Sequence, residues 1–209
     1  LYNLGLALNQ LKKYQDAITC FDKVTNIDPK HVSAINNKGI ALAELGNTDD
    51  AFQYYDNAIE IDPKYAAAHY NKGVLHDKLL QHEEAIQSLD EALKCDSGNV
   101  NTAFYKGIVL GKMKKHEESL NCFENICRKH PKHMDAFFHK GIELAELGKH
   151  ERALEIFDEL LRMHKDNVNV IYAMARSNAA IDNVGKALYL LEQAVKKDRK
   201  TIKKWALED

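Results

Sequence analysis

Five glycines follow one another along this chain at a constant spacing of 34 residues, without an insertion. They are Gly5, Gly39, Gly73, Gly107 and Gly141. All three prolines of the chain lie 24 residues after one of these glycines, at positions 29, 63 and 131. A fixed period of this length is typical of repeat proteins, in which each unit buries its apolar face by stacking on its neighbours. The sequence therefore predicts an array of similar units.

Each unit has the pattern of two amphipathic helices. In the first unit, one helical face holds Leu4, Ala7, Leu8 and Leu11, and another holds Ala17, Ile18, Phe21, Val24 and Ile27. A break near positions 12 and 13, or at Gly46 and Gly148 in later units, separates the two helices. Asp28 ends the second helix because the residue before a proline disfavours the helical conformation. Each repeat is therefore predicted to be a helix hairpin.

A small residue and a large residue recur at fixed positions in the second helix. The small residue, twelve positions after the glycine, is Ala17, Ala51, Ala85, Ser119, Ala153 or Ala187. The large residue, four positions later, is Phe21, Tyr55, Leu89, Phe123, Phe157 or Leu191. Small side chains let two helices approach more closely than the usual interaxial distance of about 8–10 Å. We therefore interpret these positions as structural.

With these positions in place, the sequence resembles the tetratricopeptide repeat (TPR) family, whose unit combines a bulky residue, Leu-Gly, Ala, an aromatic residue, Ala and Pro. NLGLALNQLKKYQDAITCFDKVTNIDP and NKGIALAELGNTDDAFQYYDNAIEIDP match this pattern at nearly every diagnostic position. The resemblance covers the whole chain and implies an all-α, right-handed superhelical solenoid of stacked hairpins, with about six repeats plus a partial seventh. The sixth repeat departs from the pattern, with Ala175 at the glycine position.

We expect a single TPR domain over residues 1–209. Its repeats are expected at approximately 1–31, 32–65, 66–99, 100–133, 134–167 and 168–201, with a terminal partial helix at 202–209.

Charge and hydropathy exclude several classes of function. The chain holds 29 basic and 31 acidic residues, a formal net charge of −2, so the extended basic face that binds a phosphate backbone is not expected. No apolar run approaches the roughly 18 residues that span a bilayer. We therefore expect no nucleic-acid partner and no membrane insertion.

The cysteines and histidines form no recognisable metal or disulfide pattern. None of the four cysteines belongs to a Cys-x-x-Cys pair, which argues against a zinc knuckle or a dense disulfide framework. His130 and His133 flank Pro131, where a metal site and a solvated loop are alternatives. No set of nucleophile, base and oxyanion donor can be assembled from the sequence. We expect a cytoplasmic, non-catalytic protein without metal or cofactor.

The resemblance also implies a binding surface, because the first helix of each TPR hairpin lines the concave groove. The groove positions, three and two before the glycine and one after it, hold Tyr2, Asn3, Leu6, Asn36, Asn37, Ile40, Tyr70, Asn71, Val74, Phe104, Tyr105, Ile108, Phe138, His139, Ile142, Tyr172, Ala173 and Arg176. From these we predict a peptide-binding groove of Tyr2, Asn3, Asn37, Ile40, Tyr70, Asn71, Val74, Phe104, Tyr105, Ile108, Phe138, Ile142 and Tyr172. An exposed aromatic stripe favours a binding surface. The alternative is that the rings bridge adjacent hairpins and are mostly buried.

Asn3, Asn37 and Asn71 share one groove position. They resemble the asparagine row with which some superhelical TPR proteins hold a peptide backbone, since an amide offers both a donor and an acceptor. Ordinary polar helix surface is the alternative. The TPR proteins that bind chaperone tails hold a terminal carboxylate with basic pairs, but the corresponding positions begin here with Ser33 and Asn37, then Ala67 and Asn71. Carboxylate-clamp activity is therefore not expected.

Two rows of opposite charge run through the repeats. Lysines precede the glycine at Lys38, Lys72, Lys106 and Lys140, and acidic residues share a second-helix position at Asp22, Asp56, Asp90, Glu124, Asp158 and Glu192. The lysines either reach these carboxylates, contributing about 0.2–1 kcal/mol per exposed pair, or form a basic stripe for an acidic partner.

These features together predict a protein-interaction scaffold that holds an extended peptide or an amphipathic helix of another protein. One alternative is self-association through the groove or the exposed ends. A second alternative is the substrate-targeting arm of an enzyme whose catalytic domain lies outside this sequence.

Overall fold

In a computed structural model of the chain, residues 1–208 are described, and they form thirteen helices and no strand. The prediction of an all-α fold of helix hairpins is confirmed. The first helices of the hairpins are α1 (Tyr2–Gln10), α3 (Val32–Glu44), α5 (Ala66–Lys78), α7 (Val100–Lys112), α9 (Met134–Glu146) and α11 (Val168–Ala180). The second helices are α2 (Tyr14–Ile27), α4 (Thr48–Ile61), α6 (His82–Cys95), α8 (His116–Lys129), α10 (His150–Met163) and α12 (Val184–Lys197). A last helix, α13 (Arg199–Glu208), follows them.

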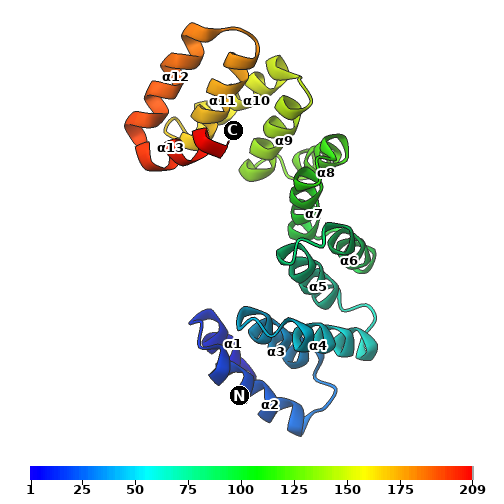
Figure 1. Cartoon of the computed structure of the whole chain (residues 1–209). Helices are drawn as coiled ribbons and strands as arrows, with labels where there is room; N and C mark the ends of the chain where they lie inside the picture. The colour runs from blue at the N-terminus through cyan, green and yellow to red at the C-terminus, as the bar shows by residue number, and fades with distance from the viewer. Residues whose placement is uncertain (209) are drawn as a thin grey trace. The chain divides into compact units, whose positions relative to one another are not determined.

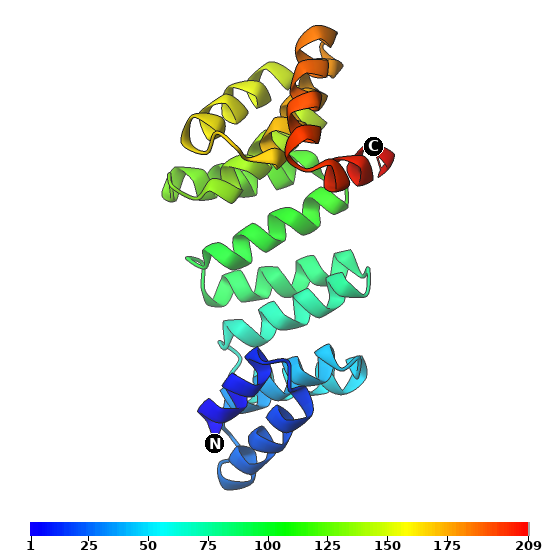
Figure 2. The ribbon, with the colours of Figure 1, turned by 90° about the vertical axis from the view of Figure 1, so that its left-hand side faces the viewer.

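The helices divide into two compact units, Leu1–Thr102 and Ala103–Asp209, with the boundary inside α7. In unit 1, consecutive hairpins pack through α2 on α3 and through α4 on α5. In unit 2, they pack through α8 on α9 and through α10 on α11. Figure 1 labels these helices, and in Figure 2 α5 and α6, in cyan to green, lie side by side. Each unit is therefore a stack of hairpins in sequence order.

The turn inside each hairpin contains one residue with a positive φ angle. These residues are Lys12, Gly46, Leu80, Lys114, Gly148 and Asp182, with φ of 58°, 86°, 61°, 58°, 72° and 59°. Only glycine adopts this left-handed conformation without a steric cost. Gly46 and Gly148 therefore fit the turn best, whereas Leu80 is held there with a side chain that is 78% exposed.

The repeated glycine makes room for the large residue of the second helix. A Cβ atom on Gly141 would lie 2.4 Å from Cε1 of Phe157, and one on Gly39 would lie 2.7 Å from Cε1 of Tyr55. Phe157 is fully buried and Tyr55 is 2% exposed. The predicted structural role of the glycine and of the large residue is therefore visible as direct packing of a side chain onto the glycine backbone.

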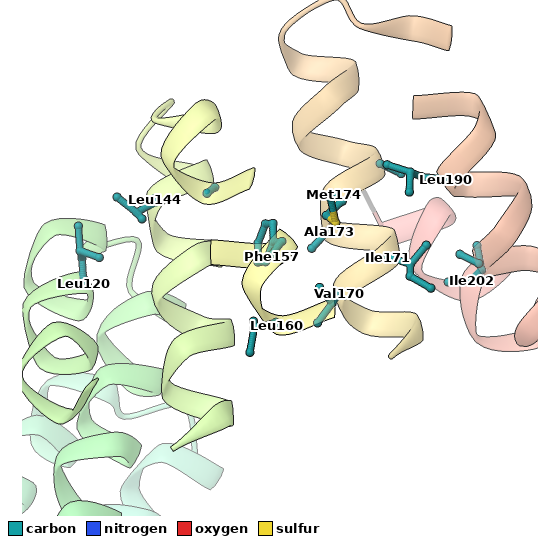
Figure 3. Close-up of a cluster of buried hydrophobic side chains, with 13 residues drawn as sticks. Leu120, Leu144, Phe157, Leu160, Val170, Ile171, Ala173, Met174, Leu190 and Ile202 are labelled. Carbon is teal, nitrogen blue, oxygen red and sulfur yellow. The ribbon is translucent and has the colours of Figure 1, made fainter. Parts of the chain in front are cut away.

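The buried cores of the two units differ in extent. In unit 1, separate clusters form around Phe21, Tyr55 and Ile35. In unit 2, one cluster of buried side chains continues from Leu120 on α8 to Ile202 on α13. Figure 3 shows its central members lying between neighbouring helices. Unit 2 is therefore joined by one continuous apolar core.

Helix α13 begins at Arg199, before the expected start at 202. Asp198 explains this start, because its Oδ1 accepts a hydrogen bond of 3.0 Å from the backbone N–H of Thr201, which satisfies one of the free donors at a helix N-terminus. Ile202 is 1% exposed and belongs to the unit 2 core. The ring of Trp205 lies 5.4 Å from the ring of Tyr172 on α11, centroid to centroid. Helix α13 therefore packs on the last hairpin.

Candidate functional site

A cavity of about 190 Å³ on the first-helix side of unit 1, here called the unit 1 pocket, contains four of the predicted groove residues. It is lined by Ile40, Ala43, Glu44, Tyr55, Tyr70, Asn71, Val74, Leu75 and Lys78. Lys78 Nζ lies 2.5 Å from Glu44 Oε1, and both side chains are more than a third exposed. Burial raises the pKa of the Tyr70 phenol, so this ring stays neutral and can donate a hydrogen bond. The unit 1 pocket therefore combines an apolar floor with neutral polar groups and a balanced ion pair.

A second cavity, of about 250 Å³, here called the unit 2 pocket, contains three further predicted residues. It is lined by Phe138, Ile142, Asn169, Tyr172, Ala173, Arg176 and Trp205. The ring of Phe138 also contacts the buried Phe157, with centroids 6.0 Å apart. Arg176 Nη2 lies 3.4 Å from Glu146 Oε1. Aromatic rings dominate the walls of this pocket, and a guanidinium group lies at its edge.

The other predicted groove residues do not line these two pockets. Asn3 is exposed, and Asn37, Tyr105 and Ile108 are half-buried. Tyr2 and Phe104 each contact a histidine that caps the first helix of the next hairpin. The ring centroid of Tyr2 lies 5.0 Å from that of His31, and the ring of Phe104 stacks on that of His133 with centroids 5.4 Å apart. These two rings therefore bridge adjacent hairpins, as the alternative interpretation of the aromatic stripe expects.

The asparagine side chains are engaged within unit 1. Asn37 Nδ2 donates to the backbone O of Ser33 at 2.7 Å and to the hydroxyl of Tyr2 at 3.2 Å. Asn71 Nδ2 donates to Oδ1 of the buried Asn36 at 2.9 Å. Part of the donor capacity of this row therefore stabilises contacts between hairpins. The role of the row in holding a peptide backbone stays a prediction.

The lysine row contributes to packing between hairpins. Lys38 pairs with Asp22, Lys72 Nζ lies 2.6 Å from Asp56 Oδ1, and Lys140 Nζ lies 3.6 Å from Glu124 Oε1. Each pair joins a first helix to the second helix of the preceding hairpin. The Lys38 ammonium group also lies 4.4 Å from the centroid of the Tyr54 ring. These contacts favour the interpretation that the lysines reach the acidic row.

The candidate metal histidine has a structural partner. Nδ1 of His133 accepts a hydrogen bond of 3.2 Å from the backbone N–H of Ala136 and so caps α9. His116 pairs with the buried Glu143, with Nδ1 and Oε2 2.8 Å apart. Among the side chains that the structure describes, no group of three or more His, Cys, Asp or Glu residues is placed to hold a metal ion.

Four lining residues of the unit 2 pocket lie outside the predicted peptide-binding set: Asn169, Ala173, Arg176 and Trp205. Arg176 occupies a groove position in the sequence, but its charge departs from the aliphatic pattern of that position. Trp205 occupies the bulky position of a seventh repeat, four residues before the expected glycine position, which is not a groove position in the family pattern. Sequence reasoning missed Trp205 because its place depends on how α13 packs against Tyr172. Its occurrence as the only tryptophan of the chain was the available signal.

The sequence matches tetratricopeptide repeat models over residues 1–31, 36–100, 106–168 and 144–208. The chain belongs to the tetratricopeptide repeat family. Repeats of this family are typically non-catalytic scaffolds for interactions between proteins, and membership supports such a role for this chain in general terms. No curated protein matches the sequence.

Solved structures of other TPR proteins share this fold. PilF of Pseudomonas aeruginosa is 19% identical to this chain, with a TM-score of 0.80. The alignment covers 100% of this chain and 96% of the PilF chain. YrrB, described as a TPR protein with an unusual peptide-binding site, is 22% identical, covers 90% of this chain with 98% of its own, and has a TM-score of 0.74. MamA from Desulfovibrio magneticus RS-1 is 17% identical, with 80% and 95% covered and a TM-score of 0.74. At these identities the likeness shows the fold.

None of the helices formed by the described residues has both the length and the apolar character needed to cross a bilayer.

Proposed function

We propose that this chain is a protein-interaction scaffold that binds an extended peptide or a helical segment of a partner protein along its first-helix face. One observation carries the proposal. Groove residues that were assigned one by one, from their positions in the repeat, line the same two cavities. Ile40, Tyr70, Asn71 and Val74 line the unit 1 pocket, and Phe138, Ile142 and Tyr172 line the unit 2 pocket. The peptide-binding site for which YrrB is described adds support from the same fold.

The chemistry of these pockets suits a peptide. Aromatic and aliphatic side chains provide apolar area, and rings lose few rotamers on binding, so they commonly dominate the binding energy. The amide of Asn71 and the hydroxyl of Tyr70 supply hydrogen-bonding groups that do not require a charged ligand. No cofactor takes part in this proposal.

Selection from a library of random twelve-residue peptides on the intact chain tests the proposal. Peptides that emerge from the selection are then titrated by calorimetry against the wild-type chain and against Tyr70→Ala and Phe138→Ala variants. Removing a central ring should weaken binding by about 2 kcal/mol, or roughly 30-fold. Tyr189→Ala is the matched control, because Tyr189 is a 61% exposed tyrosine on α12 that lines neither pocket. If both pocket variants fold normally and bind every selected peptide as the wild type does, the groove assignment is wrong.

A second candidate function is self-association, favoured by exposed apolar side chains on the first and last hairpins. Leu1, Leu4 and Leu11 are 54–67% exposed at α1, and Leu188 on α12 is 61% exposed. Large apolar side chains grouped on one surface often mark a contact with another protein. Light scattering over a range of protein concentrations tests this function. A mass that rises with concentration in the wild type and stays monomeric in Leu188→Glu supports self-association, and a constant monomer mass contradicts it.

A further inference from the structure

The unit 2 pocket contains a charge where the other repeats have an aliphatic residue. The position after the repeated glycine holds Leu6, Ile40, Val74, Ile108 and Ile142 in the first five repeats. In the sixth repeat it holds Arg176, which lines the unit 2 pocket. A guanidinium group has five N–H donors in a planar arrangement that matches a carboxylate. The substitution therefore adds an anion-binding group to a wall that is otherwise apolar.

The apolar part of the pocket fits one large side chain. Its walls include Phe138, Ile142, Tyr172 and Trp205, and its volume of about 250 Å³ is below the roughly 300–1,000 Å³ typical of sites that enclose a whole small molecule. The rings of Tyr172 and Trp205, 5.4 Å apart, form one side of the cavity. A single aromatic or leucine side chain can be buried here while the rest of its peptide stays outside.

Helix α13, which supplies Trp205 to the pocket, is rich in basic residues. It carries Arg199, Lys200, Lys203 and Lys204, all with exposed side chains that do not line the pocket, and one acidic residue, Glu208, at its end. Arg176 Nη2 lies 3.4 Å from Glu146 Oε1, and the side chain of Arg176 stays 44% exposed. A guanidinium group has five N–H donors, so it can serve Glu146 and a ligand carboxylate at the same time.

We propose that the unit 2 pocket binds a peptide segment in which a bulky apolar residue is flanked by acidic residues. The apolar side chain enters between Phe138 and Trp205, and the neighbouring carboxylates approach Arg176 and the basic face of α13. This inference rests on the proposed function and adds a preference for acidic sequence to it. In the unit 1 pocket, the basic lining residue is Lys78, which is paired with Glu44 at 2.5 Å, and no helix comparable to the basic α13 contributes to its lining.

The chain provides its own probe of this pocket, because Trp205 is its only tryptophan. Four ten-residue peptides without tryptophan serve as ligands. Three have a central Phe flanked on each side by two Glu, two Gln or two Lys residues, and the fourth has the Glu flanks with Gly in place of Phe. All four are amidated at the C-terminus, and a fifth is the free-acid form of the Gln-flanked peptide.

Titration is followed by the emission of Trp205 at low salt and at about 0.3 M salt. We expect the Glu-flanked Phe peptide to bind about tenfold more tightly than the Lys-flanked one at low salt, and the difference to shrink as salt screens the charges. The Glu-flanked Gly peptide should bind at least about tenfold more weakly than its Phe counterpart, because the apolar anchor is missing. Tighter binding of the free-acid peptide than of its amide would assign the anion site to a chain terminus and would overturn the preference for flanking acidic side chains.

Arg176→Gln tests the role of the guanidinium group, with Arg162→Gln as the matched control. Arg162 is an exposed arginine on α10 that does not line the pocket, so both variants lose one positive charge. We expect Arg176→Gln to weaken the Glu-flanked Phe peptide about fivefold and to leave the Gln-flanked peptide unchanged. Arg162→Gln should change neither affinity by more than about twofold.

The outcomes separate this inference from the proposed function. Equal affinity for the three Phe peptides, with a change in Trp205 emission in each case, overturns the acidic preference and keeps the groove. If Arg176→Gln and Arg162→Gln weaken binding of the Glu-flanked Phe peptide equally, the loss of affinity comes from the change in net charge. That result overturns the role of Arg176. If none of the peptides changes Trp205 emission, while library peptides still bind in a way that Tyr70→Ala weakens, the inference fails and the groove function stands.

Discussion

The two units have different chemistry at one repeat position of the first helix. In unit 1, the position two before the glycine holds Asn37 and Asn71, whose amides donate hydrogen bonds to neighbouring polar groups. In unit 2, the corresponding His139 stacks on Phe123, with ring centroids 5.3 Å apart. Apart from α1 and α13, the first helices have 13 residues and the second helices have 14 residues in both units. One scaffold position therefore accommodates hydrogen bonding or ring packing without a change in helix geometry.

A second comparison concerns the residue that packs on the repeated glycine. The rigid ring of Phe157 packs on Gly141 in unit 2, and rings also pack on Gly5 and Gly39 in unit 1, whereas the flexible side chain of Leu89 packs on Gly73. A rigid ring cannot yield to an added atom, but a leucine side chain can change its torsion angles. We therefore expect the Gly141 position to tolerate an added methyl group less well than the Gly73 position.

The largest effect is expected from Gly141→Ala. The new Cβ would lie 2.4 Å from Cε1 of Phe157, and we expect a loss of about 3 kcal/mol in the free energy of unfolding. Gly73→Ala, with a Cβ 2.9 Å from Cγ of Leu89 and 3.1 Å from the backbone O of Ala85, should cost about half as much. Urea unfolding followed by circular dichroism measures both.

The control for these variants is Gly185→Ala on α12, where an added Cβ meets nothing within 4 Å. This change should stabilise the chain by about 0.5–1 kcal/mol, because alanine is the better helix former. Equal losses for Gly141→Ala and Gly73→Ala would show that the rigidity of the packed side chain does not distinguish the two positions.

The turn position provides a test with opposite signs in the two units. Leu80→Gly in unit 1 should stabilise the fold by about 1 kcal/mol, because it removes a left-handed leucine. Gly148→Ala in unit 2 should destabilise it by a similar amount, since alanine would be forced to the φ of 72°. Thermal unfolding of both variants gives the comparison. If the unfolding temperatures of both variants shift in the same direction, the two turns do not share a requirement for a left-handed residue at this position.

A pH effect is expected in unit 2 at His139. Burial lowers the pKa of this imidazole below its usual 6.5, and Asp135 offsets the effect only in part. The unfolded chain then binds the proton more tightly than the folded chain does. The stabilising effect of the neutral ring is therefore complete above pH 6.5 and is lost as the pH falls from 6.5 towards the lowered pKa.

Thermal unfolding at pH 7.5 and pH 5 measures this effect. His139→Gln should lose less stability between these two values than the wild type does, because glutamine does not titrate. His164→Gln, which removes an exposed histidine on the turn after α10, serves as the control and should follow the wild type. If the stability of His139→Gln depends on pH as the wild type does, another titrating group causes the pH dependence.

The smallest effect is expected for the lysine row. Lys38 in unit 1 pairs with Asp22 and lies over the Tyr54 ring, so Lys38→Met should cost about 1 kcal/mol at pH 7. Lys140→Met in unit 2, which breaks a pair of 3.6 Å, should cost less than about 0.5 kcal/mol. Urea unfolding resolves the two, and equal costs would argue against the contribution of the ring.

The contribution of Lys38 also has a pH limit. Burial lowers the pKa of its ammonium group, but the contacts with Asp22 and Tyr54 outweigh burial and raise it above the usual 10.5. Its stabilising effect should therefore be complete below pH 10.5 and be lost as the pH rises through the raised pKa. Above that range, wild type and Lys38→Met should converge in stability.

Sequence reasoning predicted the hairpins because their determinants are local and repeated. The apolar period, the glycine position and the large residue sixteen positions later define each hairpin without knowledge of its neighbours. The membership of the pockets was predicted in part, since Ile40 and Tyr70 follow from their repeat positions. The place of Trp205 did not follow, because it depends on the capping of α13 by Asp198 and on packing against Tyr172.

Glu143 shows a second limit of sequence reasoning. Its position holds Leu75 or Val109 in earlier repeats, so a buried carboxylate was not expected there. A Cβ atom on Gly111 would lie 2.6 Å from Oε1 of Glu143, and Oε2 of Glu143 lies 2.8 Å from Nδ1 of His116. These residues belong to different repeats, and the pairing depends on side-chain conformations that a repeat alignment does not contain.

The continuous core of unit 2 has a consequence for how the chain opens in solution. Since one cluster joins α8 to α13, separating any of these helices exposes apolar surface on several others. Backbone amides of unit 2 should therefore exchange with deuterium as one cooperative group, with a common dependence on denaturant. In unit 1, separate clusters surround Phe21, Tyr55 and Ile35, and each of them joins helices of neighbouring hairpins. Exchange in unit 1 should therefore proceed in several smaller groups of amides, one for each cluster.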